Sequence, residues 1–524
     1  MIDQTPDAYN EVPYPSAAHV QTHPDRLATI ATLFGMRPPP VEHCRVLELG
    51  CGDGTNLVAM AYALPRGSFL GIDLATRPIT EGNQTIAELG LQNVRLERGD
   101  IADFNAPPES FDYIIAHGVY SWVPAAVRER LLSVCHNVLA ANGVAYISYN
   151  VYPGCHLRDL TREMMLFHVR DLPRAEEKIA QGRSLLNFLV GSKKEPDLYR
   201  LILKRELEKA MERNDAAFYH DDLGSISHPV YLHQFLSHAA QHGLQFLGDA
   251  MFNEMQPEDY TPSALAALQE LGDDIIAREQ YLDFLMCRRF RRTLLCHSEV
   301  PLDHRPRPEV IAGLYAAADV QPVSRRPDIQ SPVIEEFRAQ KGAAIQTNRS
   351  LDKAALSYLG ECWPRSVHFS ELEAAARRLA FSAEAPDSKE KNTAVLCDLL
   401  LRAYAAGIVE LHLWAPRLVT QISDRPVASP VARLENRLGK RVTTLRHTGL
   451  ELSDQISRTL LELLDGTRDF EALIDSLAGS IGSGKAQIQS EGEPVTEPAQ
   501  VRSILASELP LALQRLARCA LLVG

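Results

Sequence analysis

The sequence predicts an α/β protein whose N-terminal part forms a doubly wound parallel sheet. Short apolar runs alternate there with stretches in which apolar residues recur at helical spacing. Such alternation favours parallel strands that are covered by helices on both faces. A glycine-rich turn also follows the first apolar run, and a strand that leads through glycines into a helix is typical of a ligand-binding turn.

Each expected element of the sheet follows from an apolar run or from helical periodicity. The expected strands are 45–49, 68–73, 93–98, 111–117 and 143–149, and the expected helices between them are 57–64, 78–89 and 125–140. A helix over 22–36 precedes them, because Thr22 can cap its start and Pro24 suits a first turn. Right-handed crossovers would bring the carboxyl ends of the strands to one edge, where ligands bind.

The regular alternation stops after the fifth strand. Residues 155–230 are helix-rich and charged, which predicts a helical insertion. Two late strands are then expected, at 244–247 and 292–296, and each is preceded by a helix, at 231–242 and 277–288. With these strands the sheet would be complete, and residues 1–300 would form one α/β domain.

The rest of the chain is predicted to be mostly helical. Residues 301–332 contain several prolines and are interpreted as a connector. Residues 333–524 show two blocks of helices, each followed by a short apolar strand, and that order is typical of winged-helix units. Within the second block, residues 482–500 are rich in Gly, Ser, Glu, Pro and Gln, which predicts a mobile loop.

Composition indicates an ordinary soluble protein of 524 residues, with 23% charged and 45% hydrophobic residues. The net charge of −13 argues against nucleic acid or an anionic membrane as a partner. No signal peptide is expected, and no run approaches the roughly 18 apolar residues that span a bilayer. Nine scattered cysteines without a C-x-x-C pair favour reduced thiols. We therefore expect a cytoplasmic protein without membrane insertion.

The glycine turn lies in the stretch RVLELGCGDGTNL, residues 45–57. Gly50, Gly52 and Gly54 fall at every second position, which differs from the G-x-G-x-x-G pattern of dinucleotide-binding turns. A glycine turn that binds nothing is the alternative. Together with Glu48, however, the pattern E-x-G-x-G-x-G resembles the first motif of class I S-adenosylmethionine-dependent methyltransferases.

Two further acids suit this cofactor, because each follows a strand that would end at the same edge. Asp73 ends the second strand, and its two oxygens could accept both ribose hydroxyls; the alternative is a helix cap. Asp100 resembles the family position that accepts from the adenine amino group, with Ile101 packed on the base; the alternative is a turn aspartate. The resemblance assigns cofactor binding to Glu48, Gly50, Cys51, Gly52, Gly54, Asp73, Leu74, Asp100, Ile101 and His117.

The acceptor is expected beside the end of the fourth strand, at His117. The Pro-Pro-Tyr pattern of methyltransferases that act on nucleic-acid bases or glutamine is absent there, which argues against those substrates. Tyr120 and Trp122 could line a channel for a lysine ammonium stem or for any cationic or apolar acceptor, or could pack on the next helix. A second aromatic cluster, Tyr149 and Tyr152, follows the fifth strand. These five residues form the predicted catalytic set, and Tyr14 and His23 could fold over the cofactor.

Methyl transfer is an in-line displacement that releases a neutral thioether, so it requires no metal or covalent nucleophile. We therefore predict no metal, although His238 and His242 share one helical face at a spacing that permits a metal pair; histidines at such positions more often lie in the core or on the surface. The arginine-rich run 288–292 could suggest nucleic-acid binding. Between a helix and a strand of an acidic chain, it is interpreted as solvated or paired with carboxylates.

Several stretches together resemble bacterial methyltransferases that carry a methyltransferase regulatory domain, a group that includes rickettsial protein-lysine methyltransferases. They are HPDRLATIATLFGM (23–36), VLELGCGDG (46–54), HGVYSWVP (117–124), SYNVYPG (148–154), HPVYLHQFLSHAAQHGLQFL (228–247), REQYLDFLMCRRFRRTLL (278–295) and, more weakly, LLELLDGTRDFEALI (460–474). The resemblance implies a Rossmann-like, seven-stranded class I methyltransferase sheet, with residues 216–300 similar to the regulatory domain.

For function, the resemblance implies transfer of a methyl group from S-adenosylmethionine to a protein lysine. Two alternatives stay open at this point. One is a small-molecule methyltransferase, and the other is a non-catalytic protein that keeps the cofactor fold and docks a partner. Assembly into a homo-oligomer is also left open by the sequence.

Overall fold

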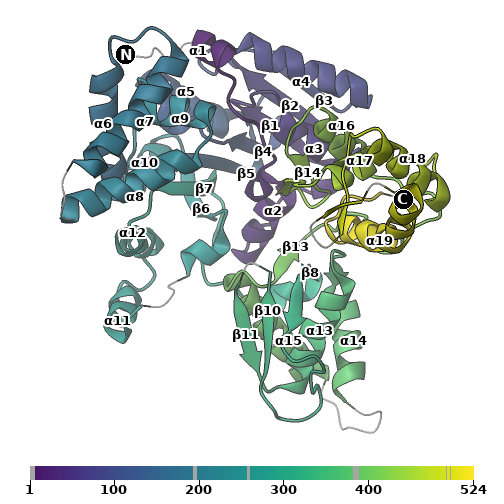
Figure 1. The fold of residues 1–524 in the computed structure, drawn as a ribbon. Coiled ribbons are helices and arrows are strands. Elements are labelled where there is room, and N and C mark those ends of the chain that lie inside the picture. Colours follow the sequence, from purple (N-terminus) through teal and green to yellow (C-terminus); the bar gives the residue numbers. More distant parts are fainter. Residues whose placement is uncertain are drawn as a thin grey trace. The chain divides into compact units, whose positions relative to one another are not determined.

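The computed structural model describes residues 6–192, 197–256, 260–340, 342–381, 389–490, 493–495 and 497–523. The chain divides into two compact units, which Figure 1 shows in ribbon form. The first unit comprises Met1–Ser16, Phe34–Leu57 and Arg66–His304, and the second comprises Ala17–Leu33, Val58–Pro65 and Arg305–Gly524.

The first unit contains a seven-stranded sheet with the strand order β3-β2-β1-β4-β5-β7-β6 (Figure 1). Its strands are β1 (Arg45–Leu49), β2 (Ser68–Asp73), β3 (Val94–Arg98), β4 (Phe111–Ala116), β5 (Leu139–Asn150), β6 (Leu244–Asp249) and β7 (Phe290–His297). The first five run parallel, whereas β7 pairs antiparallel with both β5 and β6. The predicted doubly wound fold and its two late strands are confirmed.

Helices lie between these strands close to where periodicity predicts them. They are α3 (Thr55–Ala63), α4 (Thr76–Leu89), α5 (Ala125–Val138), α10 (Leu232–Gln241) and α12 (Ile275–Met286). Two further helices, α1 (Pro6–Glu11) and α11 (Pro262–Glu270), were not predicted. The central strand β4 is buried along almost its whole length, as expected for a parallel strand between two helical layers. Strand β5 begins at Leu139 rather than at 143 and is therefore longer than predicted.

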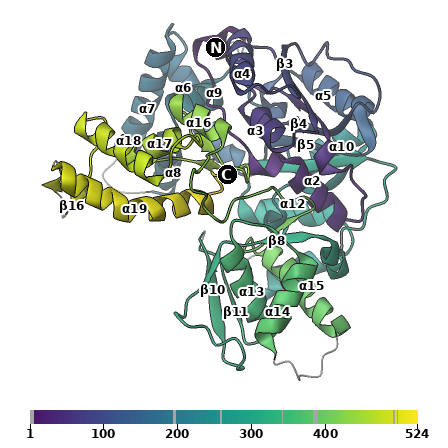
Figure 2. The same cartoon turned by 90° about the vertical axis from the view of Figure 1, so that its right-hand side faces the viewer.

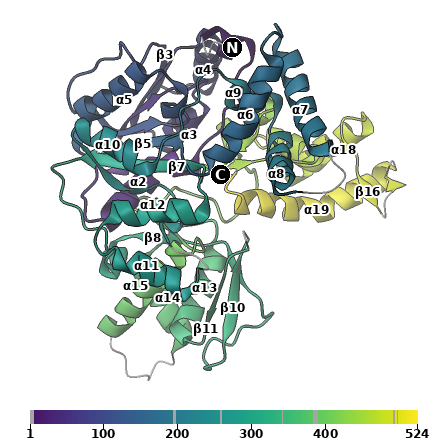
Figure 3. The same cartoon turned by 90° about the vertical axis from the view of Figure 1, so that its left-hand side faces the viewer.

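The insertion after β5 is helical, as predicted. It consists of α6 (Cys155–Val169), α7 (Ala175–Gly191), α8 (Leu198–Glu212) and α9 (Asp215–Leu223), which gather together in Figure 3. Side-chain caps start two of these helices, because Asp197 accepts from the amide of Arg200 and Asn214 accepts from that of Ala217. The insertion has its own apolar core, to which Phe218 contributes a fully buried ring.

The arginine-rich run 288–292 is paired with carboxylates, as the sequence interpretation expected. The ion pairs are Arg288 with Asp283, Arg289 with Glu206, Arg291 with Glu279 and Asp283, and Arg292 with Glu254. Arg291 is fully buried, and so are its carboxylate partners Glu279 and Asp283 and a third, Asp249, at 3.5 Å. The run therefore stabilises the junction between α12 and β7.

The second unit is rich in helices and short antiparallel sheets (Figure 2). Its helices are α2 (Pro24–Leu33), α13 (Ser350–Cys362), α14 (Phe369–Ala380), α15 (Lys389–Ala405), α16 (Pro430–Arg437), α17 (Gln455–Leu463), α18 (Phe470–Gly482) and α19 (Pro498–Arg518). Its strands are β8 (Tyr315–Ala317), β9 (Val320–Pro322), β10 (Glu335–Ala339), β11 (Ala344–Thr347), β12 (Val367–His368), β13 (Glu410–His412), β14 (Val442–Thr443), β15 (Gly449–Leu450), β16 (Gln489–Ser490) and β17 (Glu493–Pro494).

Two expectations for this unit are modified by the structure. Residues 301–332 are not only a connector, because β8 and β9 form there and bury Ala316, Ala317 and Val320. In the glycine-rich stretch 482–500, β16 pairs antiparallel with β17. Residues 491, 492 and 496 lie outside the described residues, so the mobility of this stretch stays a prediction.

None of the described helices is both long enough and apolar enough to cross a bilayer.

Candidate active site

The turn between β1 and α3 has the backbone conformation that its glycines predict. Gly50, Gly52 and Gly54 have φ angles of 76°, 56° and 70°, which L side chains rarely adopt. The amide of Gly50 donates to the carbonyl of Ile72 at 2.8 Å, and the amide of Gly52 donates to Oδ2 of Asp73 at 2.8 Å. The turn is thus held against the end of the neighbouring strand β2.

Space around the turn also requires glycine. A Cβ atom on Gly50 would stand 2.6 Å from Cγ2 of Val119, and one on Gly54 would stand 2.6 Å from Cδ1 of Leu96. A Cβ atom on Gly52, in contrast, would meet only Ser16 Oγ, at 3.6 Å. The N-terminal segment therefore passes beside the open part of the turn.

Four predicted cofactor positions lie at the carboxyl ends of adjacent strands. In the order β3-β2-β1-β4, these ends carry Asp100, Asp73, the glycine turn and His117. The ends of β2 and β3 are joined directly, because the amide of Gly99 donates to the carbonyl of Asp73 at 2.9 Å. This is the edge at which doubly wound sheets bind their ligands.

Asp73 has both carboxylate oxygens engaged by the backbone, yet each keeps a second lone pair. Oδ2 accepts from Gly52, and Oδ1 accepts from the amide of Ala75 at 2.9 Å. Burial raises the pKa of Asp73, against the lowering effect of these bonds. The next side chain, Leu74, is 39% exposed, so an acid and an apolar surface lie side by side. That pair suits a ribose and its attached base.

Glu48 has a buried carboxyl group with one engaged and one unengaged oxygen. Nδ2 of Asn56 donates to Oε1 at 2.9 Å, whereas Oε2 is buried without a hydrogen-bond partner among the described residues. Burial raises the pKa of Glu48 to about 8. An unengaged buried acceptor of this kind fits a cofactor that brings a cationic donor, such as the ammonium group of a methionine moiety.

The remaining cofactor candidates differ in exposure. Asp100 is half-buried, and its Oδ1 accepts from the amide of Ala102 at 2.8 Å. Ile101 is also half-buried. Cys51 is buried, and burial raises the pKa of its thiol well above the ordinary value. Its side chain therefore fills space beside the turn and is not a reactive thiolate.

His117 is fixed by two hydroxyl groups of β5. Its Nδ1 atom lies 2.9 Å from the Tyr146 hydroxyl and 3.2 Å from Ser148 Oγ. The ring of Phe290 meets it edge-on at a centroid distance of 6.0 Å. His117 is half-buried, and these contacts hold its ring in one orientation at the carboxyl-end edge of the sheet.

Two of the predicted acceptor residues pack in the core. The Tyr120 hydroxyl lies 2.8 Å from Nδ1 of His238, and its ring meets Phe235 edge-on. Tyr149 is buried, stacks on Phe235 at 4.0 Å, and shares a 2.8 Å hydrogen bond with Thr293. Both rings thus pack around Phe235 of α10, and their part in acceptor binding stays a prediction.

Trp122 and Tyr152 are half-buried and meet α6 instead. The guanidinium of Arg158 lies 5.4 Å from the centre of the Trp122 ring. The Tyr152 hydroxyl donates to Oδ2 of Asp159 at 2.9 Å, and its ring stacks on His156 at 4.0 Å. Both aromatic residues are thus attached to the helical insertion.

An acid that the sequence analysis did not identify, Asp221 on α9, lies close to the N-terminal segment. The Tyr14 hydroxyl donates to its Oδ2 at 3.3 Å, and burial raises the pKa of Asp221. The ring of Tyr9 stacks on His220 at 4.2 Å. Burial raises the pKa of Tyr9, and the charges of Asp221 and Asp73 both add to that effect, so Tyr9 lies near both acids.

Asp221 and Tyr9 belong to no motif at a strand end, so the sequence offers no local pattern that would reveal them. Tyr14 was expected to fold over the cofactor, and its contact with Asp221 agrees with a position at this edge. His23, expected beside it, belongs to the second unit and stacks on Trp414 there.

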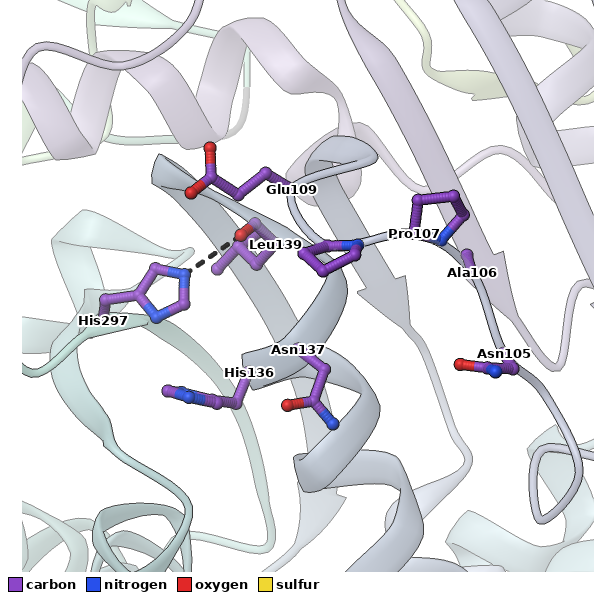
Figure 4. A pocket seen from close by; sticks show the side chains of 9 residues that line it. Asn105, Ala106, Pro107, Glu109, His136, Asn137, Leu139 and His297 are labelled. Atoms are coloured by element: carbon purple, nitrogen blue, oxygen red, sulfur yellow. Dashed lines mark hydrogen bonds between the residues drawn. The ribbon is translucent and has the colours of Figure 1, made fainter.

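A cavity of about 860 Å³ lies at the other edge of the sheet (Figure 4). It is bordered by residues 105–109, which precede β4, and by the start of β5, where Leu139 accepts a hydrogen bond from His297 at 3.1 Å. These are the amino ends of the parallel strands. The cavity is therefore remote from the glycine turn and is not the candidate active site.

Three family models match the chain. The model described as a methyltransferase domain matches residues 46–143, and a predicted methyltransferase regulatory domain matches residues 214–297. The C-terminal winged helix domain of PKMT matches residues 424–521. The first match contains the glycine turn, Asp73 and Asp100.

Relatives cover nearly the whole chain. The uncharacterized protein RP789 of Rickettsia prowazekii is 31% identical over 98% of this chain and 93% of its own length. The uncharacterized protein RP028 of the same organism is 38% identical over 46% of this chain and 96% of its own length. The structure of PKMT2 from Rickettsia typhi in complex with AdoHcy superposes with a TM-score of 0.87, at 29% identity, over 98% of this chain and 100% of that one.

The chain belongs to this family of S-adenosylmethionine-dependent methyltransferases. The methyltransferase combines a class I sheet with a regulatory segment and a C-terminal winged helix domain. Its cofactor is S-adenosylmethionine, and the predicted resemblance is confirmed. The buried, unengaged oxygen of Glu48 and the open side of Gly52 fit this cofactor.

Proposed function

We propose that the methyltransferase modifies the side-chain amine of lysine in a protein substrate. The observation that carries this proposal is Asp221, a half-buried carboxylate that accepts from Tyr14 and lies near Tyr9. A carboxylate among aromatic rings suits a cationic amine, because it offers both charge and ring faces. The similarity to PKMT2 and to the PKMT winged helix domain supports the same acceptor class.

For the cofactor, we propose that the residues at the strand ends divide the binding between them. Asp73 would accept from the ribose hydroxyls, with Leu74 against the base, and Asp100 with Ile101 would hold the other side of the base. Glu48 and the glycine turn would hold the amino-acid end. When bound, S-adenosylmethionine supplies an activated methyl group on a sulfur that leaves as a neutral thioether.

The chain's own residues would then have two tasks toward the acceptor. The first is to bind the lysine ammonium at Asp221, with Tyr9 and Tyr14 excluding water. The second is to remove a proton, because only the neutral amine carries a free electron pair. Burial raises the pKa of Asp221, so its carboxylate is suited to take that proton from the lysine nitrogen.

His117 and Trp122 would border the same edge without forming the amine site. His117 is held by Tyr146 and Ser148, so it can orient the reacting groups at the end of β4. Trp122 connects through Arg158 to Asp222, the neighbour of Asp221, because Nε of Arg158 donates to Asp222 at 3.1 Å. Tyr152 would line the approach from α6.

The proposal can be tested with cofactor that carries a radiolabelled methyl group. The full chain is incubated with this cofactor and a cell lysate, and label is counted in the protein and small-molecule fractions. A parallel lysate is acetylated beforehand to block its lysines. We expect label in protein, and its loss after acetylation. Label confined to small molecules would favour a small-molecule acceptor and would contradict the proposal.

A further inference from the structure

Glu129, His238 and His242 form a cluster of metal-ligating side chains in the first unit. Glu129 lies in the second turn of α5, and the two histidines share one face of α10 and its C-cap. One ligand atom from each residue lies within 4.8 Å of the others. We propose that this cluster binds a Zn²⁺ ion that fastens α10 to α5.

The distances are close to those of a bound ion. Nε2 of His238 lies 3.0 Å from Oε1 of Glu129, and Nε2 of His242 lies 3.1 Å from Oε2. Tetrahedral zinc with bonds of about 2.0–2.1 Å separates neighbouring ligand atoms by roughly 3.3 Å. The imidazole rings are 5.4 Å apart and inclined by 66°, so both can direct a nitrogen to one point. Small side-chain rotations would complete the site.

His238 gives a second reason to place an ion here. Its Nε2 atom is buried and makes no hydrogen bond of good geometry among the described residues, although Oε1 of Glu129 lies 3.0 Å away. A buried nitrogen atom without a partner lowers the stability of the fold unless a donor or a metal ion binds its electron pair. A metal ion between the two histidines and Glu129 would do so.

Tyr120 supplies the outer contact that a metal-binding histidine usually has. Its hydroxyl oxygen lies 2.8 Å from Nδ1 of His238, on the side of the ring opposite to Nε2. If Nδ1 donates to this oxygen, Nε2 is left with a free electron pair, and the ring is held in place.

The ligand set favours zinc. Two imidazoles and one carboxylate form a set that zinc uses with a fourth position left to water. The side chains of His238 and His242 are 16% and 19% exposed, and that of Glu129 is 59% exposed, so an ion can reach the cluster from solvent. Without metal, His242 only contacts the exposed carboxylate of Glu129 at 3.1 Å, and such surface contacts stabilise little.

The location suggests what the ion would do. Glu129 lies in the part that matches the methyltransferase domain model, and both histidines lie in the part that matches the regulatory domain model. A metal would therefore join the regulatory segment to the catalytic sheet. It would also fix Tyr120, which follows the end of β4 beside the active-site edge.

Metal content and stability test this site without measuring activity. The full chain, without a histidine tag, is stripped with a chelator, incubated with Zn²⁺, desalted and analysed for metal. We expect one zinc per chain and a higher thermal midpoint with zinc, since an ion that binds only the folded chain stabilises it. Co²⁺ in place of zinc should give the visible absorption bands of tetrahedral coordination.

Variants distinguish this site from other histidines. Glu129→Gln and His242→Ala should fold, as circular dichroism would verify, and should lose the zinc and the thermal shift. His233→Ala is the matched control, because His233 lies on α10 but contacts Gln280 instead. Equal zinc content in the wild type and both variants, or no zinc in the wild type, would overturn the proposal.

Discussion

The amide nitrogen of Gly52 lies 2.8 Å from Oδ2 of Asp73. This hydrogen bond connects the glycine turn after β1 to the acid that ends β2, so one carboxylate both shapes the turn and faces the candidate ribose position. The two residues are 21 positions apart in the chain, and the parallel pairing of β1 with β2 brings them together.

The first prediction concerns this carboxylate. Asp73→Asn should weaken the binding of S-adenosylmethionine by roughly 10- to 100-fold, because hydrogen bonds to a charged group contribute about 1.5–3 kcal/mol. Calorimetric titration of the full chain measures the effect. Asp103→Asn, an exposed acid of the turn after β3, serves as the control and should leave the affinity unchanged. Equal affinity in Asp73→Asn and the wild type would refute the assignment.

The second prediction concerns the pH dependence of stability without cofactor. The pKa of Glu48 is raised by burial from 4.5 to about 8. Below the unfolded value of 4.5 the carboxyl is protonated in both states, so its burial costs no charge. Between that value and about 8 the unfolded chain releases the proton while the folded chain keeps it, so this stability falls steadily and is lost once the pH has passed about 8. Glu48→Gln should therefore lose less thermal stability than the wild type on going from acidic to alkaline pH. Parallel melting curves would disprove this linkage.

The third prediction separates acceptor binding from cofactor binding. Asp221→Asn should lower methyl transfer to protein by about 10- to 100-fold, since it removes the charge that faces the amine. Its affinity for S-adenosylmethionine should stay unchanged. Asp215→Asn, an exposed acid at the start of the same helix, is the control. Unaltered transfer by Asp221→Asn would show that the amine binds elsewhere.

The fourth prediction concerns stability of the junction between α12 and β7. Arg291→Ala should lower the free energy of unfolding by about 3–5 kcal/mol, because it leaves buried carboxylates without their partner. Arg292→Ala, whose side chain is 24% exposed, should cost about 1 kcal/mol or less. Denaturant unfolding measures both. Similar losses for the two variants would argue against a special role for the buried network.

The fold of the first unit could be predicted closely because its strands are local features. A strand buried between two helical layers is typically a nearly continuous apolar run, and 69–72 and 113–116 are such runs. The strand β7 could also be anticipated, since an apolar run follows the helix α12, but its antiparallel direction was not predicted. In the second unit, β8 and β9 were missed because proline-rich surroundings concealed two very short strands.

The location of the cofactor candidates could be predicted because each lies at a strand end, and the topology places strand ends together. The surroundings of the acceptor candidates could not. The role of Tyr149 depends on Thr293, 144 residues away, and that of Tyr120 depends on His238, 118 residues away. Asp221 lies beside Tyr14, 207 residues away in the chain, only because the helical insertion folds back toward the N-terminal segment. Long-range packing of this kind leaves no local pattern in the sequence.

Amino-acid analysis of the labelled product tests the central claim most directly. Protein that has been labelled by the full chain with methyl-labelled cofactor is purified, hydrolysed completely and separated into its amino acids. The account predicts that the label elutes with methylated lysine and is strongly reduced when Asp221→Asn replaces the wild type. Label that elutes with methylated arginine, histidine or glutamine, or that never enters protein, would contradict it.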